Sequence, residues 1–400
     1  MKQDSQMFGT EKISKILWKM APPVMLAQLI QALYNIVDSF FVGRYSESGL
    51  TALSIIYPIQ LLMIAFAVGT GVGINTCMAH YLGLSEDEKA DEIGGIGTPL
   101  TLFMWMVFAV FCYFFMPAYA KMSTDSAEVI REVVTYGRIV CVFSFGLFLE
   151  SIWTKILQAN GDMKTPMIAQ IAGAVTNIVL DPLLIFGVFG LPKMGIAGAA
   201  AATVVGQIVA ALIVMRRGFR KSPALSVYLP DIRKIYKMGI PNILMQSAYT
   251  FYIFGLNMVL ATFSDQAVTV LGLYYKWQAF FFIPLGVLCF ELIPGQMLHV
   301  FSHDAEVIRI GKVAFRIIAA SFIPLVTSLT FPVFFQAVGK AFTSSVLTVV
   351  RTVFLFVPLG YAFSRIGLNF FWLTFPVTDI ITSIAGFLLY RRFLRFTKSS

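Results

Sequence analysis

Apolar residues occur along this chain in long runs that short polar segments interrupt. Each run has about 20 residues or more, which is the length that an α-helix needs to cross the hydrocarbon core of a bilayer. We expect about eleven membrane-spanning helices, at 16–42, 51–80, 96–119, 133–156, 166–190, 194–215, 238–262, 268–293, 307–330, 341–363 and 369–391. The pattern therefore predicts an all-α polytopic membrane protein with almost no soluble domain.

Composition supports this interpretation, because 58% of the residues are hydrophobic and 13% are charged. The formal net charge of +9 comes from clusters of basic residues that flank the apolar runs. Three clusters stand out: Lys12, Lys15 and Lys19; Arg216, Arg217, Arg220, Lys221, Arg233, Lys234 and Lys237; Arg391, Arg392, Arg395 and Lys398. All of them lie on the cytoplasmic side if the first helix runs from inside to outside, as the positive-inside rule expects. The acidic segment 85–92 is the exception among the loops expected inside.

This charge pattern predicts a multi-pass protein of the plasma (inner) membrane with both termini in the cytoplasm. The partner it indicates is the lipid bilayer, and we expect no nucleic acid. The chain has no phosphate-binding glycine loop and no nucleophile–base constellation, so we expect neither an enzyme nor an organic cofactor. The three histidines show no metal-ligand spacing with a second soft ligand, so we expect no metal site.

The chain also contains an internal repeat. Lys-Met-Ala-Pro-Pro at 19–23 matches Lys-Met-Gly-Ile-Pro at 237–241, and Gln60 matches Gln278, both at an offset of 218. We therefore expect two pseudo-symmetric helical lobes, and parallel repeats of this kind hold the substrate between the halves of a transporter. The predicted boundaries are an N-terminal six-span lobe at 1–217, a cytoplasmic linker at 218–236 and a C-terminal lobe at 237–400.

The repeat has a gap in its second half. Farther along the chain, Glu-Val-Ile-Arg at 128–131 matches 306–309, so the offset has fallen to 178 and about 40 residues are missing. The missing piece corresponds to roughly 69–110 and shortens the second lobe near 286–289. The remaining segment, 267–294, is about one span long, yet both its ends should lie outside. Either it is re-entrant and bends at Pro284–Gly286, or the topology slips after it; we expect the bent element.

Two acidic residues, Asp38 and Asp181, lie inside apolar runs. A charge at the middle of a membrane helix costs roughly 2.5–3.5 kcal/mol, so such residues usually face a cavity and serve a function. Asn177 is four residues before Asp181, which places both on one helix face. Pro182 removes a backbone hydrogen bond and should kink this helix beside the acid.

These residues and their order resemble the bacterial branch of the multidrug and toxic compound extrusion (MATE) family. The resemblance is carried by Asp-Ser-Phe-Phe-Val-Gly at 38–43, Gln-Ala-Asn-Gly-Asp at 158–162, Asn177 with Asp181-Pro182, Gly-Ile-Ala-Gly-Ala at 195–199, and the repeat. It covers essentially the whole chain except the missing piece. It implies an antiporter of twelve helices that exports mostly cationic, amphipathic compounds in exchange for H⁺ or Na⁺. This chain departs from that pattern by having about eleven spans.

By resemblance, Asp38, Asn177, Asp181 and Thr203 match positions implicated in cation coupling. Counting about 1.5 Å per residue along each helix, all of them can meet in the outer half of the first lobe if their helices are neighbours. Two carboxyls that share a cavity hold a proton tightly. The same carboxylates, with an amide and a hydroxyl, also offer oxygen ligands to a hard cation. Both H⁺ and Na⁺ therefore remain open as the coupling ion.

Two further acids lie within predicted spans. By resemblance, Glu150 attracts cationic substrates, although pairing with Lys155 or Arg138 is an equally good interpretation. Asp379 lies in the second lobe, where some members of the family bind their cation. Two basic residues within spans, Lys276 and Arg351, are candidates for pairing with such acids.

The leading hypothesis is a monomeric secondary active antiporter that exports small-molecule cationic, amphipathic drugs or toxic compounds by alternating access between its lobes. One alternative is a truncated, transport-inactive homologue, because the gap removes part of the second lobe. The other is a lipid-linked precursor flippase of the same superfamily.

Overall fold

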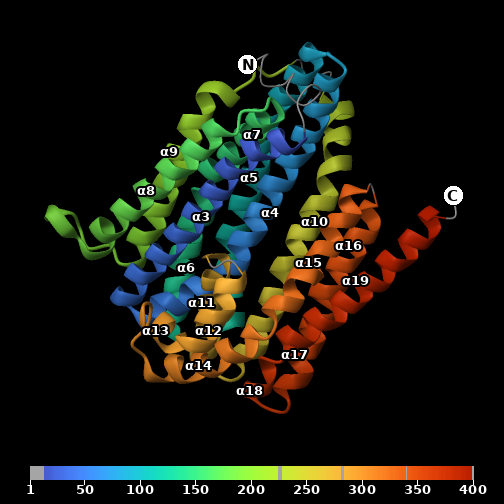
Figure 1. Ribbon diagram of the computed structural model, residues 1–400. Coiled ribbons are helices and arrows are strands. Elements are labelled where there is room, and N and C mark those ends of the chain that lie inside the picture. Colours follow the sequence, from blue (N-terminus) through green and yellow to red (C-terminus); the bar gives the residue numbers. More distant parts are fainter. Residues whose placement is uncertain (1–12, 224–227, 281–282, 339, 399–400) are drawn as a thin grey trace.

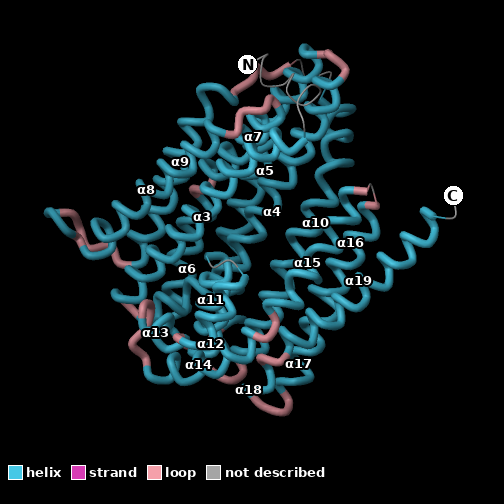
Figure 2. The backbone as a smooth tube through the Cα atoms, in the orientation of Figure 1, coloured by secondary structure: helices cyan, strands magenta, loops and turns pink. Residues whose placement is uncertain are grey.

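The regular elements of the computed structural model are helices throughout residues 13–223, 228–280, 283–338 and 340–398, which the structure describes (Figures 1 and 2). The first lobe comprises α3 (Ile13–Tyr45), α4 (Glu47–Gly83), α5 (Asp87–Ser123), α6 (Ala127–Val142), α7 (Phe145–Ala159), α8 (Lys164–Phe186), η1 (Val188–Gly190) and α9 (Ile196–Gly218). The second lobe comprises α10 (Tyr228–Ala261), α11 (Asp265–Phe280), α12 (Ile283–Leu292), α13 (Pro294–His299), α14 (Ala305–Ala319), α15 (Phe322–Ala337), α16 (Ala341–Val349), the π-helical η3 (Val350–Phe356), α17 (Val357–Ser364), α18 (Leu368–Phe371) and α19 (Thr374–Lys398).

Among the described residues, eight helices are long and apolar enough to cross a membrane alone, and two bent pairs raise the number to ten. The pairs are α6 with α7, bent by 45°, and α14 with α15, bent by 56°. The expected single spans 133–156 and 307–330 are therefore wrong in one respect, since each is broken. At each break a serine hydroxyl donates to a backbone carbonyl three residues earlier: Ser144 to Cys141 and Ser321 to Ile318, both at 2.7 Å. At the second break the Ile318 carbonyl also accepts the backbone N–H of Ser321, at 2.8 Å, so the serine closes the end of α14 with both its amide and its hydroxyl.

Helices α11 and α12 form a re-entrant helical hairpin, which confirms the bent element expected at 267–294. Thr269 near its start lies 2.8 Å from Thr51, between their Oγ1 atoms. Ser302, beyond its end, donates to the Glu47 carboxylate at 2.8 Å. Glu47 and Thr51 both belong to the beginning of α4, so the chain leaves this end of the molecule and returns to it. We call this end the hairpin face; α11 to α14 gather there at the lower edge of Figure 1.

The bend that the sequence places at Pro284–Gly286 does not occur there. These residues belong to helix α12, which runs from Ile283 to Leu292. A proline is readily accommodated in the first turn of a helix, because an amide there has no intrahelical acceptor. Pro284 therefore starts the returning helix of the hairpin. With the ten spans, the hairpin gives eleven membrane-embedded segments.

The two halves of the repeat meet along α4 and α11. Thr51 and Thr269, which touch, are 218 residues apart, and so are Tyr57 and Tyr275, whose rings stack with centroids 6.0 Å apart. A residue contacts its own repeat equivalent only beside a two-fold axis. A pseudo-two-fold axis therefore passes between α4 and α11, in the register that the offset of 218 indicates.

At the opposite face, the acidic segment 85–92 lies against the basic segment between the lobes. Arg220 Nε lies 2.7 Å from Asp91 Oδ1, and Lys89 Nζ lies 3.1 Å from Asp231 Oδ2. Two acids of the segment have neighbouring cations, since Asp91 pairs with Arg220 and Glu92 pairs with Lys89 of its own segment at 2.7 Å. Helix α10 begins at Tyr228, within the linker predicted at 218–236.

Candidate functional site

The site is built around α8, whose start is fixed by the turn at 158–162. Gly161 has a φ of +81°, a conformation that favours glycine, and it directs the chain into α8. The Asp162 carboxylate then accepts the backbone N–H groups of Lys164 and Thr165, at 3.1 and 3.0 Å. Such a cap satisfies amides that the first turn leaves unpaired. The cap fixes where α8 begins, and the next five turns carry Asn177 and Asp181 to their places.

Helix α8 packs closely on α9 through two facing glycines. A Cβ on Gly206 would lie 2.6 Å from the carbonyl oxygen of Gly173, and one on Gly173 would lie 2.7 Å from that of Gly206. Small residues at a helix crossing let two backbones approach each other in a membrane. One turn farther along α8, this approach brings Asn177 within reach of Thr203 on α9.

Asn177, Asp181 and Thr203 form one buried hydrogen-bonded cluster. The Asn177 Nδ2 atom lies 3.4 Å from Asp181 Oδ1 and 3.3 Å from Thr203 Oγ1. Turning the amide over gives better partners, since its nitrogen then donates to Asp181 Oδ2 at 3.2 Å and its oxygen accepts from Thr203 N at 3.1 Å. We assign the second orientation, because an amide group is placed by its hydrogen-bond network. Three of the four residues predicted for cation coupling are thus in direct contact.

The fourth, Asp38, lies on α3, which packs against α8. Its side chain is buried, and its Oδ1 atom has no hydrogen-bond partner in the part of the chain that the structure describes. Asp38 lines a cavity of about 100 Å³ together with Thr203, which links this cavity to the cluster. A buried carboxylate oxygen without a donor is costly and is a natural ligand for a proton or a metal cation.

Most residues that line this cavity were not among the predicted site residues; Tyr34, Gln60, Tyr136 and Lys276 are four of the polar ones. The first three are uncharged polar residues inside spans; Gln60 stands out only as a repeat position, and nothing in the sequence marks any of the three as a site residue. Lys276 is different, because a charge in an apolar run is the same signal that identified Asp38. The Lys276 ammonium donates a hydrogen bond to the hydroxyl of Ser39, the residue that follows Asp38 on α3.

Glu150 faces a separate cavity of about 340 Å³ in the first lobe, which Lys155 also lines. Its Oε1 atom accepts from Thr154 Oγ1 at 2.8 Å. The alternative pairings of Glu150 are not formed. Lys155 donates to Gln158 at 2.9 Å, Arg138 donates to the Tyr113 carbonyl at 3.2 Å, and the described residues show no ion pair within 4 Å of Glu150. The carboxylate is available to a cation that enters this cavity.

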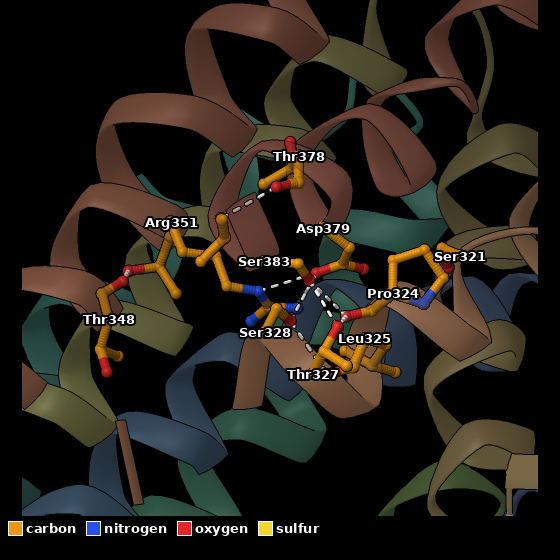
Figure 3. Close-up of polar contacts among 12 residues, drawn as sticks. Ser321, Pro324, Leu325, Thr327, Ser328, Thr348, Arg351, Thr378, Asp379 and Ser383 are labelled. Atoms are coloured by element: carbon orange, nitrogen blue, oxygen red, sulfur yellow. Dashed lines mark hydrogen bonds and ion pairs between the residues drawn. The ribbon is translucent and has the colours of Figure 1, made fainter. Parts of the chain in front are cut away.

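Asp379 forms a buried ion pair with Arg351, shown in Figure 3. Arg351 Nε and a terminal guanidinium nitrogen lie 2.9 and 2.8 Å from Asp379 Oδ1, and the Ser328 hydroxyl donates to the same oxygen at 3.1 Å. The expectation that a basic residue within a span pairs with an acid is confirmed here. Arg351 belongs to η3, and π-helical turns are frequent at functional sites. A cation role for Asp379 stays a prediction, and such a cation would have to replace the guanidinium.

A larger cavity of about 570 Å³ lies between the lobes, within the range of drug-sized sites. It is lined from both halves of the repeat by tyrosines, glutamines and apolar side chains. The polar lining residues are Tyr57, Gln246, Tyr249, Tyr252, Tyr275, Gln278 and Arg351.

One family model, MatE, matches residues 23–183 of the chain. Similar proteins include the "Probable multidrug resistance protein YoeA" of Bacillus subtilis (30% identical over 247 residues, 62% of this chain and 53% of YoeA) and the "Multidrug export protein MepA" of Staphylococcus haemolyticus (26% over 288 residues, 70% and 63%). The chain thus spans about half to two thirds of the length of these relatives. The "FAD transporter" of Shewanella oneidensis is 22% identical over 439 residues, 97% of this chain and 96% of that protein.

Solved structures share the fold. A multidrug resistance MATE family transporter in an inward-facing conformation superposes with a TM-score of 0.79 at 22% identity, over 92% of this chain and 96% of that one.

Proposed function

We infer that the chain is a member of the MATE family, and from this premise we propose that it is a secondary active antiporter that exports cationic, amphipathic compounds in exchange for H⁺ or Na⁺. The observation that carries the proposal is the site on α3, α8 and α9. There, Asp38 and Asp181 are both buried, and neither forms an ion pair with a basic residue in the part of the chain that the structure describes. Acids placed in this way inside a membrane protein mark an ion pathway.

Both coupling ions fit the side chains at this site. A proton would neutralise one carboxyl of the pair, and the energetic gain is large because the carboxyls lie out of water. A sodium ion would take oxygen ligands from Asp38, Asp181, Asn177 and Thr203. In either case the ion neutralises the site, and loss of that ion on the other side of the membrane restores its charge. Alternation between the two states drives export.

The cavity between the lobes is the proposed substrate site. Its tyrosine rings offer flat surfaces on which aromatic compounds stack and against which an organic cation is attracted. Glu150, in the neighbouring first-lobe cavity, adds a negative charge on the path of a cation. Gln246 lines both cavities, which makes them neighbouring compartments.

A second candidate cargo is a planar anion. Among the residues described as lining the cavity between the lobes, Arg351 carries the only formal charge, and it is positive. A guanidinium in a ring of tyrosines suits an aromatic group joined to phosphate. The relative that is named an FAD transporter gives this chemistry a concrete probe.

The proposal is tested by efflux of a fluorescent cationic dye from drug-sensitive, energised cells. The comparison is between the wild-type chain, Asp181→Asn and the exposed control Asp125→Asn, at matched levels in the membrane. We expect export to fall at least about tenfold in Asp181→Asn only. Negligible efflux from all three would favour the truncated, inactive homologue. Export of FAD but not of dye would favour the anionic cargo, and export of neither with flipping of a lipid-linked precursor would favour the flippase.

A further inference from the structure

We propose that Lys276 is a tethered cation of the first-lobe site, which the hairpin inserts beside Asp38 and which competes with the coupling ion for that carboxylate. This inference rests on the proposed function, because it assigns a regulator to the same ion site. Lys276 belongs to the second half of the repeat, whereas Asp38 belongs to the first. The lysine would therefore connect the state of the ion site to the position of the hairpin.

The geometry places the ammonium next to the acid without joining the two. Lys276 Nζ donates to Ser39 Oγ, and Ser39 Oγ donates in turn to the Asn35 carbonyl at 2.7 Å. Lys276 and Asp38 line the same cavity of about 100 Å³ and interact electrostatically. The other titratable groups around this cavity are the four tyrosines at positions 34, 57, 136 and 275.

The charges explain why the lysine belongs there. A buried ammonium is unfavourable unless an opposite charge lies close by, and the same holds for the buried carboxylate. Lys276 and Asp38 meet this need for each other. The hydrogen bond that Lys276 donates goes to Ser39, and Asp38 Oδ1 has a free lone pair that a second cation can use. A cation that binds there enters a site already holding a positive charge, so its affinity is lowered or the lysine must withdraw.

The repeat shows that this pair is not part of the packing common to both halves. At the offset of 218, the equivalent of Lys276 is Pro58, and the equivalent of Asp38 is Leu256. Ser39 corresponds to Asn257, which donates to the Ser54 carbonyl at 3.3 Å, an ordinary helix-to-helix contact. The charges therefore occur once, on a scaffold that is otherwise repeated. This asymmetry is expected if Lys276 and Asp38 serve the first-lobe ion site and not the packing of the lobes.

When the hairpin is docked, the Lys276 ammonium places one positive charge beside the two acids, even when no coupling ion is bound. Arrival of H⁺ or Na⁺ at Asp38 removes the charge that holds Lys276, and the hairpin is then free to move. Docking of the hairpin and binding of the ion thus oppose each other. This opposition gives the second lobe a direct response to ion binding in the first.

The test measures cation binding on the purified full-length chain in detergent. Stabilisation against thermal unfolding reports binding, since a ligand of the folded state raises the unfolding temperature. Two titrations are made: NaCl at constant ionic strength with choline chloride, and acidification without Na⁺. They are carried out on wild type, Lys276→Met, Lys276→Gln and Lys276→Arg. The two neutral variants guard against a folding defect peculiar to one of them.

We expect the half-saturating concentration of Na⁺ or of H⁺ to fall about tenfold in the neutral variants, which corresponds to a coupling of about 1.4 kcal/mol. Lys276→Arg, which keeps the charge, should restore the wild-type concentration. The shift should vanish when Asp38→Asn is added. The inference would be overturned if the half-saturating concentrations of both cations were the same in the neutral variants as in wild type. It would also be overturned if neither cation changed the unfolding temperature of any of these proteins.

The outcome is separable from that of the dye assay. A shifted titration in a chain that exports nothing would keep the tethered lysine and reject the exporter. Export that depends on Asp181, with titrations that ignore Lys276, would keep the exporter and reject the tethered lysine.

Discussion

Buried charges in this protein fall into two kinds, which differ in whether a partner contacts them. Arg351 and Asp379 are held by two short contacts to one carboxylate oxygen. Asp38 and Asp181 have no such partner within the described chain, although Lys276 is near the first. The sequence predicts the positions of all these charges, because each interrupts an apolar run. It does not predict which acid is paired, since that depends on how each helix is rotated about its axis.

Substitution of Arg351 tests how much the buried ion pair with Asp379 contributes to the stability of the protein. Arg351→Met should lower the free energy of unfolding by about 3–5 kcal/mol, because it leaves Asp379 buried without a counter-charge. The double variant Arg351→Met/Asp379→Leu should recover most of the loss, since an apolar pair of similar volume is often as stable as a buried ion pair. Unfolding in detergent micelles with increasing dodecyl sulfate measures both.

The control is Arg309→Met, which breaks an exposed pair with Glu306 of similar geometry (2.6 Å). Solvent screens such a pair, so unfolding should hardly change. If Arg351→Met proves as mild as this control, the second-lobe pair is solvated and is not a structural ion pair.

At the scale of the helix, hydropathy predicts the segments well and their breaks poorly. The runs at 133–156 and 307–330 are predicted as single spans because their residues are apolar throughout. Hydropathy does not indicate where a helix bends. The serines that bridge the breaks, Ser144 and Ser321, are too common to serve as signals. The hairpin could be predicted, because the repeat requires both ends of 267–294 on one side. The predicted bend at Pro284–Gly286 is wrong, because Pro284 lies in the first turn of α12 and proline starts helices as readily as it interrupts them.

The crossing of α8 and α9 holds the ion site together, and Gly206 is its narrowest point. Gly206→Leu should push α9 away from Gly173 and separate Asn177 from Thr203, because a side chain there meets backbone. Overpacking costs about 1–3 kcal/mol, so we expect a lower unfolding temperature and loss of dye efflux. Gly83→Leu is a matched control, since its Cβ would meet no atom within 4 Å. Equal effects of the two substitutions would show that α8 and α9 are not tightly apposed.

At the scale of the molecule, the two lobes pack together around the pseudo-two-fold axis. The buried charges do not follow this symmetry. Thr51 faces Thr269 and Tyr57 faces Tyr275, so equivalent residues pack on one another where α4 meets α11. The repeat offset predicts these pairs as equivalents, but only the fold shows that they touch. The hairpin contains the part of the repeat that lies at the axis, so the shortening predicted for the second lobe leaves this contact in place.

A disulfide across the axis tests this arrangement directly. In Thr51→Cys/Thr269→Cys the two sulfur atoms would replace hydroxyls only 2.8 Å apart, which is close enough for a bond to form with little movement. The four native cysteines, which are free, are first replaced by serine or alanine. A protease site is inserted in the segment between α9 and α10. After cleavage, we expect the lobes to run as one band on a denaturing gel without reductant and as two with it.

Thr51→Cys alone is the control and should give two bands in both lanes. Two bands from the double variant under oxidising conditions would mean that α11 does not lie against the start of α4, and the pseudo-two-fold axis would have to be placed elsewhere. Suppose that the double variant runs as a single band and that it exports dye only after the disulfide is reduced. This result would show that the hairpin must leave α4 during the transport cycle, which is the movement that a competing Lys276 requires.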